Sequence, residues 1–193
     1  MKRQTKIFII SGPGGAGKTT LVNRLFRREA IKNHFVRSVS FTTRKRRANE
    51  KEGRDYCFVS QDKFRTLQRK HFFLESQKVL NDYYGTPKYF YTQALTAKKD
   101  LILCIDVKGG IYLKRNLKLG KIVTIFISAP NKEELYRRLK RRVEKNDLIR
   151  KRLRLAKKEL QCAQRYDYLI INRDVEESFN ILETILLAEK FRR

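Results

Sequence analysis

The chain has 193 residues, of which 46 are Lys or Arg and 20 are Asp or Glu, giving a formal net charge of +26. A hydrophobic share of 41% and a charged share of 34% exclude an intrinsically disordered chain, and the length suits one globular domain with a small inserted subdomain. Every apolar run is far shorter than the roughly 18 residues that span a bilayer, so neither a membrane span nor a secretion signal is expected.

The strong positive charge would attract nucleic acid or an anionic membrane non-specifically at low salt. We interpret it as a basic, solvated surface, and we expect neither a dedicated nucleic-acid partner nor membrane association. The cysteines Cys57, Cys104 and Cys162 lie far apart without a C-x-x-C pair, so neither a disulfide framework nor a zinc site is indicated. A reducing cytoplasm is therefore the expected location, and the sequence does not indicate an oligomeric state.

The first element is an apolar strand over residues 7–10, which leads into a loop of the form G-x-x-x-x-G-K-[ST] and then into a helical pattern. This is the context of a phosphate-binding P-loop, in which glycines let backbone N–H groups turn toward phosphate oxygens. We expect Lys18 to reach the β- and γ-phosphates of ATP and the Thr19 hydroxyl to bind Mg²⁺. The expected phosphate-binding residues are Gly12, Pro13, Gly14, Gly15, Ala16, Gly17, Lys18, Thr19 and Thr20.

Downstream, the apolar residues alternate between strand and helix spacing. The expected strands and apolar segments are 35–41, 56–59, 72–75, 101–106, 122–127 and 168–171. The expected helices run from the P-loop to about residue 32, from a cap at Ser60, over about 88–98, from a capping box at Asn131 and Glu134, and from another at Asp174 and Glu177. This order predicts an α/β fold of the P-loop NTPase type, a doubly wound parallel sheet with ligands at the carboxyl ends of its strands.

Between residues 40 and 93, clustered short strands interrupt the alternation and indicate an insertion beside the core. Five blocks of sequence, in order and spacing, resemble guanylate kinases. The blocks are Ser40-Phe41-Thr42-Thr43-Arg44-x-x-Arg47, Gly53-x-Asp55-Tyr56-x-Phe58-Val59, Phe73-Leu74-Glu75, Tyr83-Tyr84-Gly85-Thr86 and Ile105-Asp106-x-x-Gly109. The resemblance covers nearly the whole chain. It implies one domain with a core (1–37, 94–131 and 156–193), a GMP-binding insertion (38–93) and a helical lid (132–155).

The resemblance also implies roles for single residues. The phosphate of GMP would be held by Arg44, Arg47, Tyr56 and Tyr84. The guanine would be read by Ser40, Glu75 and Thr86, with Asp106 contacting guanine or magnesium-bound water. The residue chemistry agrees, because two guanidiniums can grip a phosphate through paired charge-assisted hydrogen bonds, and a carboxylate can accept from the N1–H and N2–H₂ donors of guanine.

The resemblance of the basic segment to the family's lid assigns Arg142 and Arg152 to the transferring phosphoryl group, with Arg138 assisting. Separately, Asn172 resembles the family's residue near the adenine. Four residues depart from the family pattern, and the lid is about one residue short. Arg173 stands where aspartate is usual, and Asn81 stands where glycine is usual beside the tyrosine pair. Cys104 stands where an acidic residue is usual, and Val143 stands where glycine is usual.

The predicted reaction is Mg²⁺-dependent transfer of the γ-phosphoryl group from ATP to GMP, and also to dGMP, under a closing lid. Two alternatives remain open at this point. One is a non-catalytic guanylate-kinase-like module that binds a protein in the GMP cleft, against which the complete P-loop argues. The other is a P-loop kinase for another phosphorylated acceptor, or an RNA-associated protein that exploits the positive charge.

Overall fold

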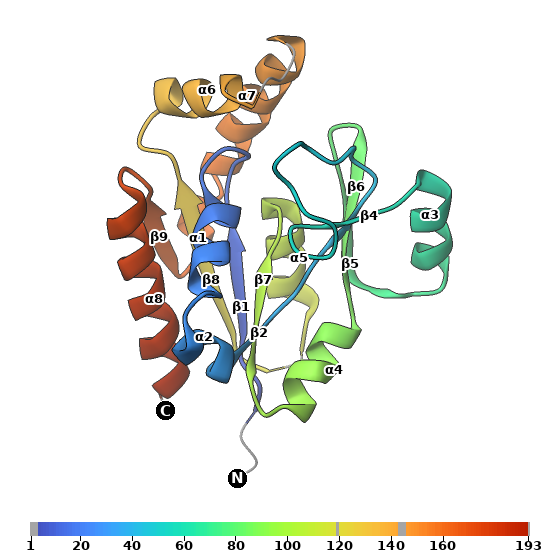
Figure 1. The fold of residues 1–193 in the computed structure, drawn as a ribbon, viewed down its shortest axis with the longest axis vertical. Coiled ribbons are helices and arrows are strands. Elements are labelled where there is room, and N and C mark those ends of the chain that lie inside the picture. Colours follow the sequence, from blue (N-terminus) through green and yellow to red (C-terminus); the bar gives the residue numbers. More distant parts are fainter. Residues whose placement is uncertain (1–3, 119, 143–145, 193) are drawn as a thin grey trace.

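A computed structural model describes residues 4–118, 120–142 and 146–192 (Figure 1). Its centre is a five-stranded sheet in which all neighbouring strands are parallel. In spatial order the strands are β2 (Phe35–Arg37), β7 (Asp100–Cys104), β1 (Ile7–Ser11), β8 (Ile122–Ser128) and β9 (Tyr168–Ile171). The predicted α/β fold with a parallel sheet is confirmed.

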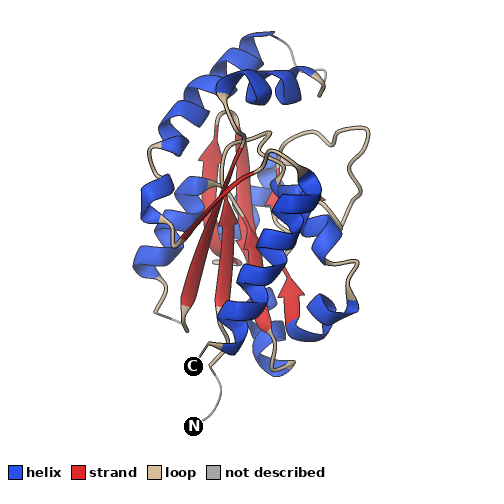
Figure 2. Ribbon diagram, turned by 90° about the vertical axis from the view of Figure 1, so that its left-hand side faces the viewer, coloured by secondary structure: helices blue, strands red, loops and turns tan. Residues whose placement is uncertain are grey.

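The sheet is buried on both faces, which explains its uninterrupted apolar strands. Because side chains alternate along a strand, Phe8 and Ile10 of β1 pack on one face, and Ile7 and Ile9 pack on the other. The first face is covered by α1 (Lys18–Leu25) and α8 (Val175–Phe191), and the second by α4 (Tyr89–Thr96) and α5 (Val107–Asn116) (Figures 1 and 2). The helices therefore fix the sheet from both sides and leave the carboxyl ends of its strands for the loops.

The single helix expected from the P-loop to about residue 32 was wrong. The structure has α1 and then a separate α2 (Glu29–His34), with a tight turn at residues 26–28. The reason lies in the apolar spacing. Ile31 follows Leu25 by six residues, so one continuous helix would carry it about 120° away from the buried stripe. Restarting the helix lets Ile31 reach the core, where it is fully buried.

The strand expected over 35–41 is confirmed only for residues 35–37, because the chain changes sheets after them. β2 ends at Arg37, and β3 (Phe41–Thr42) belongs to a second, four-stranded sheet. The order of this smaller sheet is β4 (Cys57–Phe58), β3, β6 (Asp82–Pro87) and β5 (Phe73–Val79). The helix α3 (Gln61–Arg69) packs on it through Phe64, whose ring stacks on Phe73 at a centroid distance of 4.6 Å.

The predicted helix caps at Ser60, Asn131 and Asp174 are confirmed. Each side chain accepts a hydrogen bond from the backbone N–H three residues later. The Asn131 cap starts α6 (Lys132–Lys140), which is followed by α7 (Asn146–Leu160) and by a short 3₁₀ turn, η1 (Ala163–Arg165). Helices α6 and α7 project past the P-loop end of the sheet (Figure 1). The expected departure at Val143 lies outside the described residues. None of the helices traced in 4–118, 120–142 and 146–192 has the length and hydropathy needed to cross a bilayer.

Candidate active site

A cavity of about 710 Å³ opens at the carboxyl ends of the parallel strands. Four parts of the chain line it: the P-loop with the start of α1, the segment around the smaller sheet, residues 104–106 at the end of β7, and the α6–α7 region. Of the residues expected to bind phosphate, nucleotide or base, those on its wall are Gly12, Gly14, Gly15, Gly17, Lys18, Thr19, Thr20, Ser40, Arg44, Arg47, Tyr56, Glu75, Tyr84, Asp106, Arg142 and Arg152. The wall does not include Pro13, Ala16, Thr86 and Asn172, which lie behind it.

The P-loop has a backbone that requires glycine at two points. Gly12 has φ of +143°, and a Cβ there would lie 1.9 Å from the carbonyl oxygen of Ile127. Gly17 has φ of +98°, and a Cβ there would lie 2.2 Å from the side-chain nitrogen of Asn172. Any side chain at these positions would force the loop away from the sheet, so the glycines fix the loop's shape as well as its access to phosphate.

Lys18 begins α1 and folds back over the loop. Its Nζ donates to the carbonyl oxygens of Gly12 and Pro13 at 2.7 and 3.0 Å. Burial lowers its pKa from the ordinary value of 10.5, while Cys104, Glu159 and Asp106 act in the opposite direction. Two carbonyl groups thus hold the ammonium at the cavity wall, and a phosphate could replace them as its hydrogen-bond acceptors.

The donor set near Thr19 suits a Mg²⁺ ion that arrives with a nucleotide. In the part of the chain that the structure describes, no cluster of three or more His, Cys, Asp or Glu side chains could hold a metal. Mg²⁺ commonly keeps several waters and binds through few protein oxygens plus substrate phosphates. A lone hydroxyl at Thr19, on the same cavity wall as Asp106, fits that mode.

Asn172 supports the P-loop from behind. It is 1% exposed, and its side-chain Nδ2 donates to the backbone carbonyl oxygen of Ala16 at 2.8 Å. The backbone carbonyl oxygen of Asn172 accepts from the Arg138 guanidinium at 2.9 Å. Arg138 is anchored in turn by Glu134, at 2.7 Å. The structure therefore connects α6 to the P-loop through Arg138 and Asn172, instead of pointing either side chain into the cavity.

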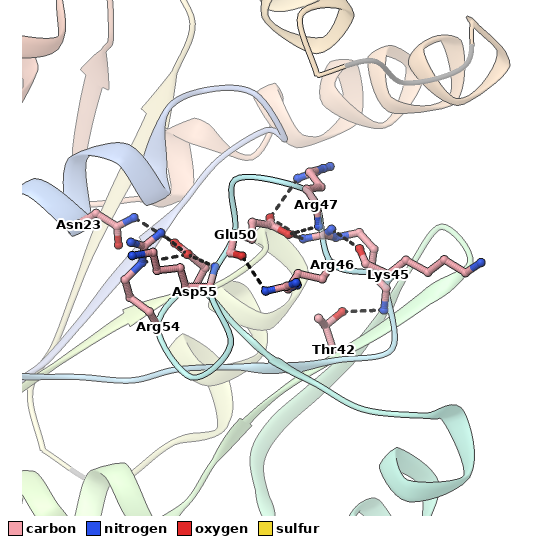
Figure 3. A network of polar contacts seen from close by, with 10 residues as sticks. Asn23, Thr42, Lys45, Arg46, Arg47, Glu50, Arg54 and Asp55 are labelled. Atoms are coloured by element: carbon pink, nitrogen blue, oxygen red, sulfur yellow. Dashed lines mark hydrogen bonds and ion pairs between the residues drawn. The ribbon is translucent and has the colours of Figure 1, made fainter.

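Across the cavity, a corner of basic and aromatic side chains surrounds Arg44. The guanidinium of Arg44 lies 5.5 Å from the ring centroid of Tyr56, and the rings of Tyr56 and Tyr84 meet edge to face at 5.9 Å. Arg44 also donates to both carboxylate oxygens of Glu50, at 2.7 and 3.0 Å, and the backbone N–H of Arg47 donates to Glu50 at 2.9 Å (Figure 3). The role of Glu50 was not predicted from the sequence. The signal available was a carboxylate three residues after the basic run that ends at Arg47.

A buried carboxyl group lies deeper on the same side. Glu75 of β5 is 4% exposed, and one of its oxygens accepts from the Thr86 hydroxyl at 2.8 Å. The Ser40 hydroxyl lies 3.1 Å from that of Thr86. The other oxygen of Glu75 is buried with no hydrogen-bond partner among the described side chains and backbone. Burial, helped by nearby Asp106, raises the pKa of Glu75 to about 8. This arrangement leaves one acceptor oxygen for a ligand.

Asp106 connects this group to the sheet. Its carboxylate caps α5 by accepting from the Gly109 N–H at 3.0 Å, and burial raises its pKa. A Cβ at Gly109 would lie 2.7 Å from the carboxylate of Glu75. Glycine at this position is therefore what allows α5 to approach the carboxyl group of Glu75 so closely.

The α7 helix contributes Arg152, Leu155 and Glu159 to the cavity wall, at a spacing that places all three on one face of the helix. Arg142 and Arg141, just after α6, line the same end. Glu159 was missed from the sequence. It is 8% exposed, and burial raises its pKa to about 7, against the opposing effect of Lys18. Only its helical spacing from Arg152 could have indicated it.

A P-loop that shares one cavity with the Arg44–Tyr56–Tyr84 corner and the buried carboxyl group of Glu75 is the arrangement of a P-loop kinase that acts on nucleoside monophosphates. The comparisons with known proteins narrow this class. The family model described as guanylate kinase matches residues 4–189. The chain belongs to the guanylate kinase family, whose members phosphorylate GMP with ATP.

Individual relatives agree with the family assignment. The chain is 42% identical to a guanylate kinase of Koribacter versatilis, over 97% of this chain and 80% of that protein. It is 41% identical to one of Chlamydia muridarum, over 97% of this chain and 89% of that protein. A crystal structure of guanylate kinase from Anaplasma phagocytophilum superposes with a TM-score of 0.80 at 32% identity, covering 99% of this chain and 89% of that one.

Proposed function

We propose that this cavity transfers the γ-phosphoryl group of ATP to GMP in a single in-line step. The P-loop residues hold the ATP phosphates, and the segment 38–93 holds GMP. The observation that carries this assignment is that Lys18, Arg44 and Glu75 line one cavity, and that one carboxylate oxygen of Glu75 has no hydrogen-bond partner among the described residues. A donor phosphate and an acceptor nucleotide can thus meet within it.

In this scheme the phosphate of GMP is the nucleophile, so no protein group forms a covalent bond to substrate. Lys18 neutralises charge on the β- and γ-phosphates, and Arg142 and Arg152 do so from the α6–α7 side. Thr19 would hold Mg²⁺, which supplies further neutralisation of phosphate charge. The lid that we assign to 132–155 keeps water from the transferring group, since an open site would hydrolyse ATP.

On the acceptor side, Arg44, Arg47, Tyr56 and Tyr84 are proposed to hold the phosphate. Glu75 accepts from guanine N1–H and N2–H₂, with Ser40 nearby and Thr86 fixing the carboxylate. These contacts involve the base and the phosphate, not the ribose, so dGMP is proposed as a second acceptor. The proposed setting is the cytoplasm, with no dedicated nucleic-acid or membrane partner.

A coupled assay of ADP formation tests the proposal, with GMP, dGMP, IMP, AMP, UMP and CMP offered separately in the presence of ATP and Mg²⁺. Turnover with GMP and dGMP, far less efficient turnover with IMP, which lacks the N2 amino group, and none with AMP, UMP or CMP is the expected result. Turnover with AMP or a pyrimidine nucleotide at a similar rate would overturn the assignment of Glu75. Binding of GMP without any turnover would instead favour a binding module.

We expect GMP affinity to rise with pH up to about 8. A protonated Glu75 cannot accept from both guanine donors. Burial with Asp106 nearby raises the pKa of Glu75 from 4.5 to about 8. Each unit of pH below 8 should therefore weaken GMP binding by roughly tenfold. The raised pKa also means that the folded state holds the Glu75 proton more tightly than the unfolded state does. The contribution of this proton to the free energy of unfolding is therefore complete below pH 4.5 and is lost as the pH rises through 8. Calorimetric titration of GMP between about pH 6 and 8, in the wild type and in Glu75→Gln, checks this; a profile unchanged in the variant would contradict it.

A further inference from the structure

The P-loop helix and the acceptor-side loop contact each other directly through one polar side chain, Asn23 (Figure 3). Asn23 lies on α1, four residues after Thr19, and it is on the cavity wall. Its Nδ2 donates to a carboxylate oxygen of Asp55 at 3.0 Å, and its Oδ1 accepts from Arg37 at 2.6 Å. Both ends of the amide are therefore engaged, which fixes its orientation between the core and the loop.

Asp55 organises the loop that contains it. It is 8% exposed and accepts from the Lys51 N–H at 2.9 Å and from the Arg54 guanidinium at 3.0 and 2.6 Å, as well as from Asn23. Burial opposes ionisation, but hydrogen bonds from Asn23, Lys51 and Arg54 keep the pKa of Asp55 below its ordinary value. A carboxylate with this many donors holds the backbone of residues 51–55 in one shape.

The next residue in the chain is Tyr56, whose ring contacts both Arg44 and Tyr84. The Asn23–Asp55 hydrogen bond thus joins the helix that starts with Lys18 to the corner that is proposed to hold the GMP phosphate. A helix of two turns moves as a rigid unit, so any shift of α1 on phosphate binding would be carried to Asp55 through Asn23.

We infer that Asn23 is a positioning residue that couples the two nucleotide subsites: it ties the Asp55–Tyr56 corner to the P-loop helix, so that ATP and GMP strengthen each other's binding. This inference rests on the proposed function. Coupling of this kind is reciprocal and typically changes affinity by about 5- to 150-fold. Without the Asn23 amide, the two nucleotides should bind independently, so each should bind with nearly the same affinity whether or not the other is present.

The test is the affinity of GMP measured by calorimetry with and without a non-hydrolysable ATP analogue and Mg²⁺, in the wild type, Asn23→Ala and Asn116→Ala. Asn116 is a matched control, because it is an exposed helical asparagine whose amide donates to a backbone carbonyl, that of Tyr112. In the wild type and in Asn116→Ala, the analogue should tighten GMP binding at least about fivefold. In Asn23→Ala, it should tighten GMP binding less than about twofold, while GMP alone binds within about twofold of wild type.

A purely structural role would have a different signature. If Asn23→Ala weakened GMP equally with and without the analogue, or if the wild type showed no coupling, the inference would be overturned. Alanine has the higher helix propensity, and thermal unfolding of each variant establishes that the fold is intact. The double variant Asn23→Ala/Asp55→Asn should show no further loss of coupling beyond either single variant; additive losses would overturn the pairing of Asn23 with Asp55. If the wild type bound no GMP at all, the proposed function itself would fail.

Discussion

Replacing Lys18 by Met should lower kcat on the order of 10³-fold and leave the protein at least as stable as before. The ammonium is placed to neutralise charge on the transferring phosphoryl group, and Met removes that charge while keeping a similar length of side chain. Stability should not fall, because burial lowers the pKa of Lys18, so folding opposes its charged form. Steady-state kinetics together with thermal unfolding measure the two effects.

The matched control is Lys63→Met, which makes the same change at an exposed position of α3, away from the cavity. We expect this variant to retain wild-type kcat. A Lys18→Met enzyme with nearly full turnover would remove Lys18 from the mechanism. A Lys18→Met protein that is inactive but has lost its cooperative melting transition would instead show that the two hydrogen bonds to Gly12 and Pro13 are needed for the fold of the loop.

Replacing Glu75 by Gln should raise KM for GMP on the order of 100-fold, because the oxygen proposed to accept charge-assisted hydrogen bonds from guanine becomes an NH₂ group, a donor that faces the guanine donors. Gln can still accept from Thr86, so the change is confined to the oxygen that faces the ligand. IMP lacks the N2 amino group and loses less, so the preference for GMP over IMP should collapse. KM and kcat for both nucleotides provide the measurement.

Glu133→Gln, at an exposed position in the first turn of α6, is the control for the loss of a carboxylate. Its preference for GMP over IMP should match that of the wild type. The proposed role of Glu75 is contradicted if Glu75→Gln keeps the wild-type ratio of kcat/KM for the two nucleotides. Equal losses on GMP and IMP would also contradict it, since they would indicate a general disturbance of the site.

Much of the fold could be predicted because its signals are local. The run 101–105 is apolar without a break and the run 122–127 is interrupted only by Thr124, since both faces of the sheet are covered. The caps at Ser60, Asn131 and Asp174 are set by side chains three residues from their partners. The P-loop is local in the same way, because loop, lysine and helix start are consecutive.

The errors arose where distant contacts decide the local structure. The helix α5 was not predicted, because Gly109 and Gly110 lower helix propensity; they are needed because a side chain at Gly110 would lie 2.6 Å from the Tyr166 hydroxyl. Glu159 is missed for a related reason. Its place on the cavity wall follows from the packing of α7, and no pattern near residue 159 encodes the position of Lys18. The change of sheet after Arg37 likewise depends on strands that come later in the chain.

The acceptor-side segment leaves and re-enters the large sheet at adjacent strands. β2 and β7 are hydrogen-bonded neighbours, and the Ser38 N–H continues their ladder to the carbonyl oxygen of Ile102 at 3.0 Å. The more than 60 residues between them are therefore an excursion with closely spaced ends, and its entropic cost grows only with the logarithm of its length. An ancestral kinase could exchange this excursion, and with it the acceptor, without redesigning the ATP-binding core. Two junctions that such a graft must reproduce are the contact between Glu75 and the glycine at 109 and the hydrogen bond between Asn23 and Asp55.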